Sequence, residues 1–185
     1  MARRKTQNAI ILLTFLATMA GVNTSAQNDL EAAKPVFRAP FDLKLAVDKV
    51  HYYQQHFDKI PYVIENDVYL FAGESFGINV TVVDNQIVGV TYQPDSAKSD
   101  VWFTFSQEFD DHAPEMMMLT TRNGLKRRLL FDALMTVPGK EGIFRTNILP
   151  IDPGLSSYES WPHPIVQLVL RNFRFVEGST ATPRK

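Results

Sequence analysis

Hydrophobic and polar positions alternate along much of the chain with a period of two, which is the spacing of an extended strand. In residues 41–47 (FDLKLAV), the hydrophobic residues Phe41, Leu43, Leu45 and Val47 fall on one side of such a strand. Short runs rich in β-branched and aromatic residues predict further strands, with prolines and glycines mostly between them. These runs cover residues 68–71, 78–83, 86–91, 101–107, 115–121, 143–149 and 165–175.

The clearest local prediction is a hairpin in the segment GINVTVVDNQIVGVTYQ. Asp84 and Asn85 separate two β-branched runs, and both residue types tolerate the left-handed backbone of a two-residue turn. With these two residues as the turn, Val82 should lie opposite Ile87. The same register sets Val80 opposite Gly89, further from the turn.

Residues 125–135 (LKRRLLFDALM) are ambiguous. Their leucines and alanine fit helical spacing, and most of the residue types favour helices. Asn123-Gly124, however, directly follows a predicted strand and is a strong hairpin signal. We therefore favour a strand over residues 125–135, paired through this turn with residues 115–121.

Three consecutive methionines, Met116, Met117 and Met118, lie in the first strand of that second predicted hairpin. Thioethers are ligands for cuprous copper, but methionine also fills irregular gaps in cores. The sequence supplies no further methionine or histidine at similar spacing nearby, so core packing is the favoured interpretation. The register predicts that the methionines face a hydrophobic set: Leu129, Leu130 and Phe131.

The same register places Glu115 opposite Asp132, where two carboxylates would repel each other unless something neutralised them. A metal ion bound by carboxylates and imidazole is one explanation. The simpler alternatives are that the ladder ends before residue 115 or that the turn is longer. The candidate metal ligands are Asp110, Asp111, His112, Glu115 and Asp132.

A second candidate site consists of aromatic and histidine residues, which could hold a sugar or a peptide on large rings with polar tips. The alternative is that about half of these rings lie in the core. No pair of the four histidines has the spacing of a zinc motif. The candidate ligand-binding residues are His51, Tyr52, Tyr53, His56, Tyr158 and Trp161.

The N-terminus has the three parts of a secretory signal peptide: a basic start, an uncharged run over residues 9–22, and small residues before Gln27. The uncharged run is too short to span a bilayer well. We expect cleavage after residue 26, an exposed arm over residues 27–40, one domain over residues 41–176 and a disordered tail over residues 177–185. The mature chain would carry no membrane anchor.

Composition narrows the choice of fold and function. The chain has no cysteine, so disulfides and thiolate sites are excluded, and the mature 159 residues would carry a net charge of −4. This mild acidity argues against nucleic-acid binding. The many short strands predict an all-β, single antiparallel β-sandwich of immunoglobulin-like architecture, although the cysteine pair of antibody domains is missing.

The leading functional hypothesis is an exported, non-catalytic binding or assembly module that needs no cofactor. Its partner would be another exported protein or a glycan. Catalytic serine and phosphate-binding motifs are absent from the sequence. The alternatives are a metal-assisted or carboxylate-dependent hydrolase, since carboxylate pairs assemble in space rather than in sequence, and a soluble metal-binding protein.

Overall fold

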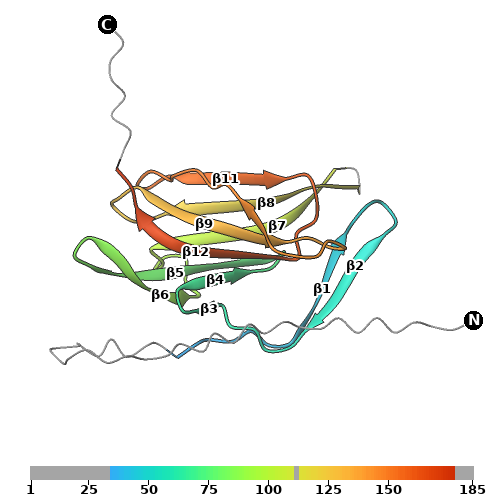
Figure 1. Ribbon diagram of the computed structural model, residues 1–185, viewed down its shortest axis with the longest axis horizontal. Coiled ribbons are helices and arrows are strands. Elements are labelled where there is room, and N and C mark those ends of the chain that lie inside the picture. The colour runs from blue at the N-terminus through green and yellow to red at the C-terminus, as the bar shows by residue number, and fades with distance from the viewer. Residues whose placement is uncertain (1–33, 111–112, 178–185) are drawn as a thin grey trace, which may run out of the picture. The chain divides into compact units, whose positions relative to one another are not determined.

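The structure is a computed structural model that describes residues 34–110 and 113–177 (Figure 1). The predicted signal peptide and most of the predicted tail lie outside these residues. The described part of the chain contains no helix that could cross a membrane. Its strands are β1 (Phe41–Ala46), β2 (Tyr52–Phe57), β3 (Val63–Ile64), β4 (Asp67–Leu70), β5 (Glu74–Val83), β6 (Gln86–Gln93), β7 (Val101–Asp110), β8 (Ala113–Asn123), β9 (Leu129–Thr136), β10 (Phe144–Thr146), β11 (Ser156–Trp161) and β12 (Gln167–Phe175).

Two five-stranded sheets make up most of the domain. Sheet I has the strand order β10-β9-β12-β4-β3, and sheet II has the order β11-β8-β7-β5-β6. The neighbouring strands in both sheets pair antiparallel. The chain passes between the sheets after β4, β8, β10 and β11, so neighbours in sequence often lie in different sheets.

The core lies between the inner faces of the two sheets. Phe103 of β7 in sheet II meets Phe131 of β9 and Phe173 of β12 in sheet I, with ring centroids 6.0 and 6.4 Å apart. Alternate residues of β7 and β9 are buried, as the period of two predicts. The domain is therefore all-β with sheets packed as a β-sandwich, as the sequence predicts.

The hairpin of β5 and β6 confirms the predicted turn. Asp84 and Asn85 both have positive φ, and Val82 lies opposite Ile87. The pairing then shifts by one residue between Thr81 and Val82, because Val88 of β6 is inserted without a partner, so Val80 lies opposite Val90 rather than Gly89. Gly89, next to the inserted residue, is the kind of interior strand glycine that often marks a bulge, and the predicted register left this signal out.

The second predicted hairpin is wrong, although the favoured strand over its later part is confirmed by β9. β8 belongs to sheet II and β9 to sheet I, so Asn123-Gly124 marks a passage between sheets. The fully buried Asn123 side chain donates from Nδ2 to the carbonyls of Arg127 (2.8 Å) and Ile151 (2.9 Å). Its Oδ1 accepts from the amide of Leu125 at 3.0 Å.

The segment before β1 was predicted to be an exposed arm, but Arg38 is only 4% exposed. Its guanidinium donates to Glu74 Oε2 (2.8 Å) and to the carbonyl of Pro61 (2.7 Å), and it lies 4.0 Å from the centre of the Tyr62 ring. A buried arginine needs such partners. Residues 34–40 are therefore anchored to the domain by Arg38, while their other side chains are exposed.

The hairpin of β1 and β2 forms a separate two-stranded sheet (Figure 1). Gln107 in the second half of β7 links it to sheet II, because its side chain donates to the carbonyl of Ala46 (2.7 Å) and accepts from the Ala46 amide (2.9 Å). Leu43 and Leu45 are buried in the common core. The hairpin is therefore a packed part of the domain, held by hydrophobic contacts and by one side chain.

Candidate functional site

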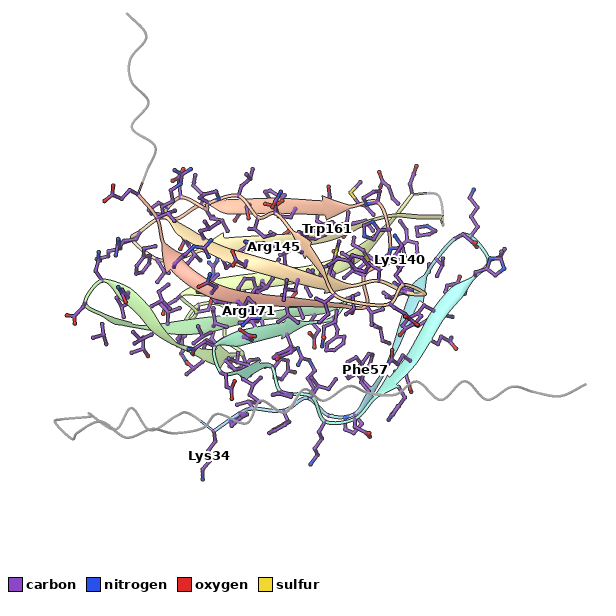
Figure 2. All side chains as sticks on the ribbon, viewed as in Figure 1. Lys34, Phe57, Lys140, Arg145, Trp161 and Arg171 are labelled. Carbon is purple, nitrogen blue, oxygen red and sulfur yellow. The ribbon has the colours of Figure 1, made fainter. Side chains whose placement is uncertain are left out.

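A groove of about 570 Å³ lies on sheet I, within the usual size range of small-molecule sites. Figure 2 labels its two arginines, Arg145 and Arg171, which come from β10 and β12. The groove collects residues from β4, β9, β10 and β12 of sheet I, from β6 of sheet II and from the turn before β4. Its lining is Glu65, Asn66, Asp67, Ile87, Val90, Asp132, Leu134, Arg145, Arg171, Asn172 and Phe173.

Strand register explains why charged side chains gather in this groove. In β9 the buried residues Phe131 and Ala133 alternate with Asp132 and Leu134, which therefore face outward from the core. Asp132 lies opposite Arg171 of β12. Leu134 lies opposite Arg145 of β10. The charged side chains that β9, β10 and β12 contribute are thus outward-facing residues of adjacent strands.

A β-bulge completes the arrangement. The pairing of β12 with β9 shifts between Arg171 and Arg174, and Asn172 within the bulge has a φ of 57°. Bulges commonly redirect side chains in this way. Here the bulge brings Asn172 Nδ2 to 3.1 Å and Arg174 Nη2 to 3.0 Å from the carboxylate of Asp132.

Asp132 is surrounded by donors. Besides Asn172 and Arg174, the guanidinium of Arg145 lies 3.3 Å from its Oδ1. The Asn172 hydrogen bond is the largest cause that holds the pKa of Asp132 below its usual range, and Arg174 and Arg145 lower this pKa further. Burial raises it, but by less than the Asn172 hydrogen bond lowers it. Asp132 is therefore ionised at neutral pH and positions the donors around it.

Asp67, on the other side of Arg171, has the opposite shift. Burial raises the pKa of the Asp67 carboxyl, and Arg171, whose Nε lies 3.6 Å from Oδ1, only partly offsets this effect. Nearby Glu65 raises it further. The groove therefore holds two carboxyl groups whose environments change their pKa values in opposite directions.

Arg145 and Arg171 remain accessible. Their side chains are 69% and 50% exposed, and each lies within ion-pair distance of one carboxylate oxygen. A guanidinium has five N–H donors in a planar fork, so one such contact leaves several donors unused. Both arginines can therefore bind a further acceptor that enters the groove.

The structure separates the predicted metal ligands. Glu115 is on β8 of sheet II, whereas Asp132 is on β9 of sheet I, so the predicted pairing of these two carboxylates is wrong. Asp110 ends β7, and Asp111 and His112 lie outside the described residues. Within residues 34–110 and 113–177, no three histidine, aspartate or glutamate side chains converge on one point that a metal could occupy.

The predicted core packing of the three methionines is confirmed for Met117 only. Met117 is fully buried and lies opposite Gln107 and Trp161, not opposite β9. Met116 and Met118 alternate with it and are partly exposed. Met116 also lines a small pocket of about 30 Å³ with Glu115 and His163, a space that holds little more than one water molecule.

The candidate aromatic residues do not form one surface. His51, Tyr52, Tyr53 and His56 lie on or beside β2, where His51 and His56 pair with Asp48 and Asp42. Tyr52 is 52% exposed, whereas Tyr53 packs against the core.

Tyr158 and Trp161 of β11 have different environments. Tyr158 is 70% exposed, but Trp161 is buried at 7% and donates from Nε1 to Thr146 Oγ1 at 2.8 Å. These two rings therefore do not form one exposed surface.

Of the residues that line the groove, only Asp132 was among the candidate site residues predicted from the sequence. An alternating pattern over residues 165–175 would place Arg171 on the outer face, but nothing local shows that Arg145 and Asp67 lie beside it. Comparisons with protein-family models, with curated proteins and with solved structures found no match. Function must therefore be inferred from the chemistry of the groove.

Proposed function

We propose that this protein is an exported, non-catalytic binding module and that the groove on sheet I is its binding site. One observation carries the proposal: a groove of about 570 Å³ gathers five charged side chains from separate segments of the chain. Charged side chains at this density, among them two arginines with unused N–H donors, are suited to recognise a polar ligand. The ligand would be a glycan or a polar group of another exported protein.

The geometry of Asp132 favours binding over catalysis. Its two oxygens accept hydrogen bonds from Asn172 and Arg174, and Arg145 forms an ion pair with it at 3.3 Å, which stabilises the charged form and occupies much of its accepting capacity. A general base works best with a pKa near the operating pH, and the pKa of Asp132 is shifted away from it. Asp132 fits the role of an anchor for the surrounding donors.

A panel of defined glycans tests the proposal, with binding measured for the wild type and for Leu134→Trp. Leu134 lines the groove and is partly exposed, so a larger ring there should fill the space. We expect at least one glycan to bind the wild type and to lose most of its affinity for Leu134→Trp. Val83→Trp, at an exposed position outside the groove lining, is the matched control and should bind normally.

Both variants must melt close to the wild-type temperature for the comparison to hold. Binding that survives in Leu134→Trp would contradict the proposed site, because the ligand would then contact another surface.

A carboxylate-dependent hydrolase is the second candidate function. The observation in its favour is that Asp67 and Asp132 line the same groove with pKa values shifted up and down, the division expected for an acid and a base. If this function is correct, Asp67→Asn should abolish the hydrolysis of a bound glycan without preventing its binding. Unchanged glycan after long incubation with the wild type would exclude it for that glycan.

Export and the finer fold assignment are parts of the same proposal. The basic start, uncharged run and small residues before Gln27 support a signal peptide, and the two antiparallel sheets support an immunoglobulin-like sandwich. N-terminal sequencing of the protein recovered from periplasm or medium should begin at Gln27. A protein that stays in the cytoplasm with residues 1–26 attached would contradict export.

A further inference from the structure

We infer that the ligand of the groove is an acidic saccharide, whose carboxylates bind Arg145 and Arg171. This inference rests on the proposed binding function and specifies its ligand. It depends on three features of the groove: the unused donors of two exposed arginines, the acceptors beside them, and the lack of an exposed aromatic ring in the lining.

The arginines supply the charge recognition. Arg145 and Arg171 are each held by one carboxylate, at 3.3 Å from Asp132 and 3.6 Å from Asp67. Such contacts orient a guanidinium without using its whole planar fork, which matches a carboxylate in two parallel hydrogen bonds. A carboxylate on the ligand would bind the free side of either arginine.

Acceptors beside the arginines suit hydroxyl groups. Asn172 uses its Nδ2 to donate to Asp132, while its Oδ1 makes no hydrogen bond among the described residues. Glu65 and Asp67 add carboxylate oxygens to the same lining. Alternating carboxylates and hydroxyls on a ligand would therefore meet donors and acceptors in turn, which is the chemistry of a uronic acid chain.

The lining offers little to a neutral sugar that binds by stacking. Phe173 is its one aromatic residue and is only 6% exposed, because its ring packs in the core against Phe131. Rings in sugar sites contribute a large contact area. Without such a ring, charge must supply much of the affinity, so an uncharged saccharide of the same shape should bind weakly.

The position of the groove favours a saccharide over a peptide. Peptides that bind sheets gain their main-chain hydrogen bonds at an open edge. The groove lies instead across β9 and β12, the latter flanked by a strand on each side in sheet I. Leu168–Leu170 pair on both sides, and the ladder with β9 is interrupted only at Asn172 and Phe173. This interruption is too short for a peptide strand to pair along, so recognition here must use mainly side chains.

Calorimetric titration of the purified protein tests the inference with two probes that differ mainly in charge: trigalacturonate and its fully methyl-esterified form. We expect the acid to bind and the ester to bind at least about tenfold more weakly, since hydrogen bonds to charged groups are worth more than neutral ones. Raising the salt concentration should also weaken the binding of the acid to the protein.

Variants identify the site. Arg145→Gln and Arg171→Gln should each weaken acid binding by about tenfold. Lys98→Gln, which removes an equally positive but 74% exposed charge outside the groove lining, should change little. Asp67→Asn should strengthen acid binding, because it removes a negative charge and frees Arg171; a merely structural role for Asp67 would not produce this gain.

Three results would overturn the inference. Equal binding of the acid and the ester would show that the ligand's charge is not recognised. If Leu134→Trp abolished this charge-independent binding, the proposed binding function of the groove would still stand. Equal effects of the arginine variants and Lys98→Gln would show general attraction away from the groove. Failure of both probes would exclude this ligand class, while the wider glycan panel would decide the binding function separately.

Discussion

At the scale of single residues, Arg38 combines burial with charge. It is 4% exposed, pairs with Glu74 and lies over Tyr62, so its removal would leave the Glu74 carboxylate without its main partner. We expect Arg38→Ala to lower the free energy of unfolding by about 3 kcal/mol, measured by urea denaturation.

The control for that prediction replaces both charges. Arg38→Met combined with Glu74→Leu should recover only part of the loss, because it removes the unpaired charge but leaves the Pro61 carbonyl and the Phe71 amide without their side-chain partners. A stability for Arg38→Ala within about 0.5 kcal/mol of the wild type, the usual range for surface positions, would show that the pair is not a structural anchor.

Asp48, in the turn between β1 and β2, gives a prediction about pH. Its Oδ1 accepts from the amides of Val50 (2.9 Å) and His51 (2.8 Å), and its Oδ2 lies 2.7 Å from His51 Nδ1. The Val50 hydrogen bond is the largest cause that lowers the pKa of Asp48 from 3.8 to about 2, and His51 adds to it. We expect an NMR titration of the Asp48 carboxyl carbon to give this value.

The sign of the pH effect follows from the lowered pKa. The contribution of Asp48 to stability is complete above the ordinary pKa of 3.8 and is lost as the pH falls toward about 2. His51→Ala should raise the pKa part of the way back, because one of its causes is removed. A midpoint near 3.8 in the wild type would mean that the turn does not hold these hydrogen bonds.

At the scale of elements, two similar turn signals had different outcomes. Asp84-Asn85 forms the predicted turn, whereas Asn123-Gly124 ends β8 and leads the chain into the other sheet. Both pairs lie between hydrophobic runs, so local sequence does not separate them. The difference is tertiary, because Asn123 is buried among carbonyls of later segments.

Glycine also has a different role at the second turn. The amide of Gly124 donates to the carbonyl of Asp100 at 2.8 Å, and a Cβ on Gly124 would lie 2.9 Å from that same oxygen. Glycine is therefore needed here for close approach of two backbone segments. A hairpin turn would instead need it for a left-handed backbone.

Asn123→Ala tests the passage between the sheets. The change would leave the carbonyls of Arg127 and Ile151 and the amide of Leu125 without their side-chain partner, so we expect a loss of about 2–3 kcal/mol in the free energy of unfolding. Ser156→Ala, at an exposed position of β11, should change stability by less than about 0.5 kcal/mol. Equal effects of the two substitutions would contradict the structural role of Asn123.

At the scale of the whole molecule, alternation and turn residues were enough to predict an all-β sandwich. They work because each strand buries one face, and this leaves a local period of two in the sequence. A strand as short as β3 and the bulge of β12 leave no such period. Which strands become neighbours depends on packing between distant segments, and this is where the prediction for β8 and β9 failed.

The candidate site was harder to predict for the same reason. Arg145, Arg171, Asp67 and Asp132 lie on four different strands, and register alone brings them to one groove. Asp132 was selected from a wrong pairing with Glu115, so its place in the groove was not foreseen. Charged residues at outward-facing strand positions can be assigned to a common site only when the order of the strands in the sheet is known.

The central claim is that the groove on sheet I binds an acidic ligand through its arginines. The most direct measurement is an NMR titration of the isotope-labelled protein with trigalacturonate, following the backbone amides and the Nε–H signals of arginine. We predict that the largest shifts occur at Arg145, Arg171 and Asn172 and are absent with the methyl ester. Shifts confined to the β1–β2 hairpin or to sheet II, with these three residues unchanged, would contradict it.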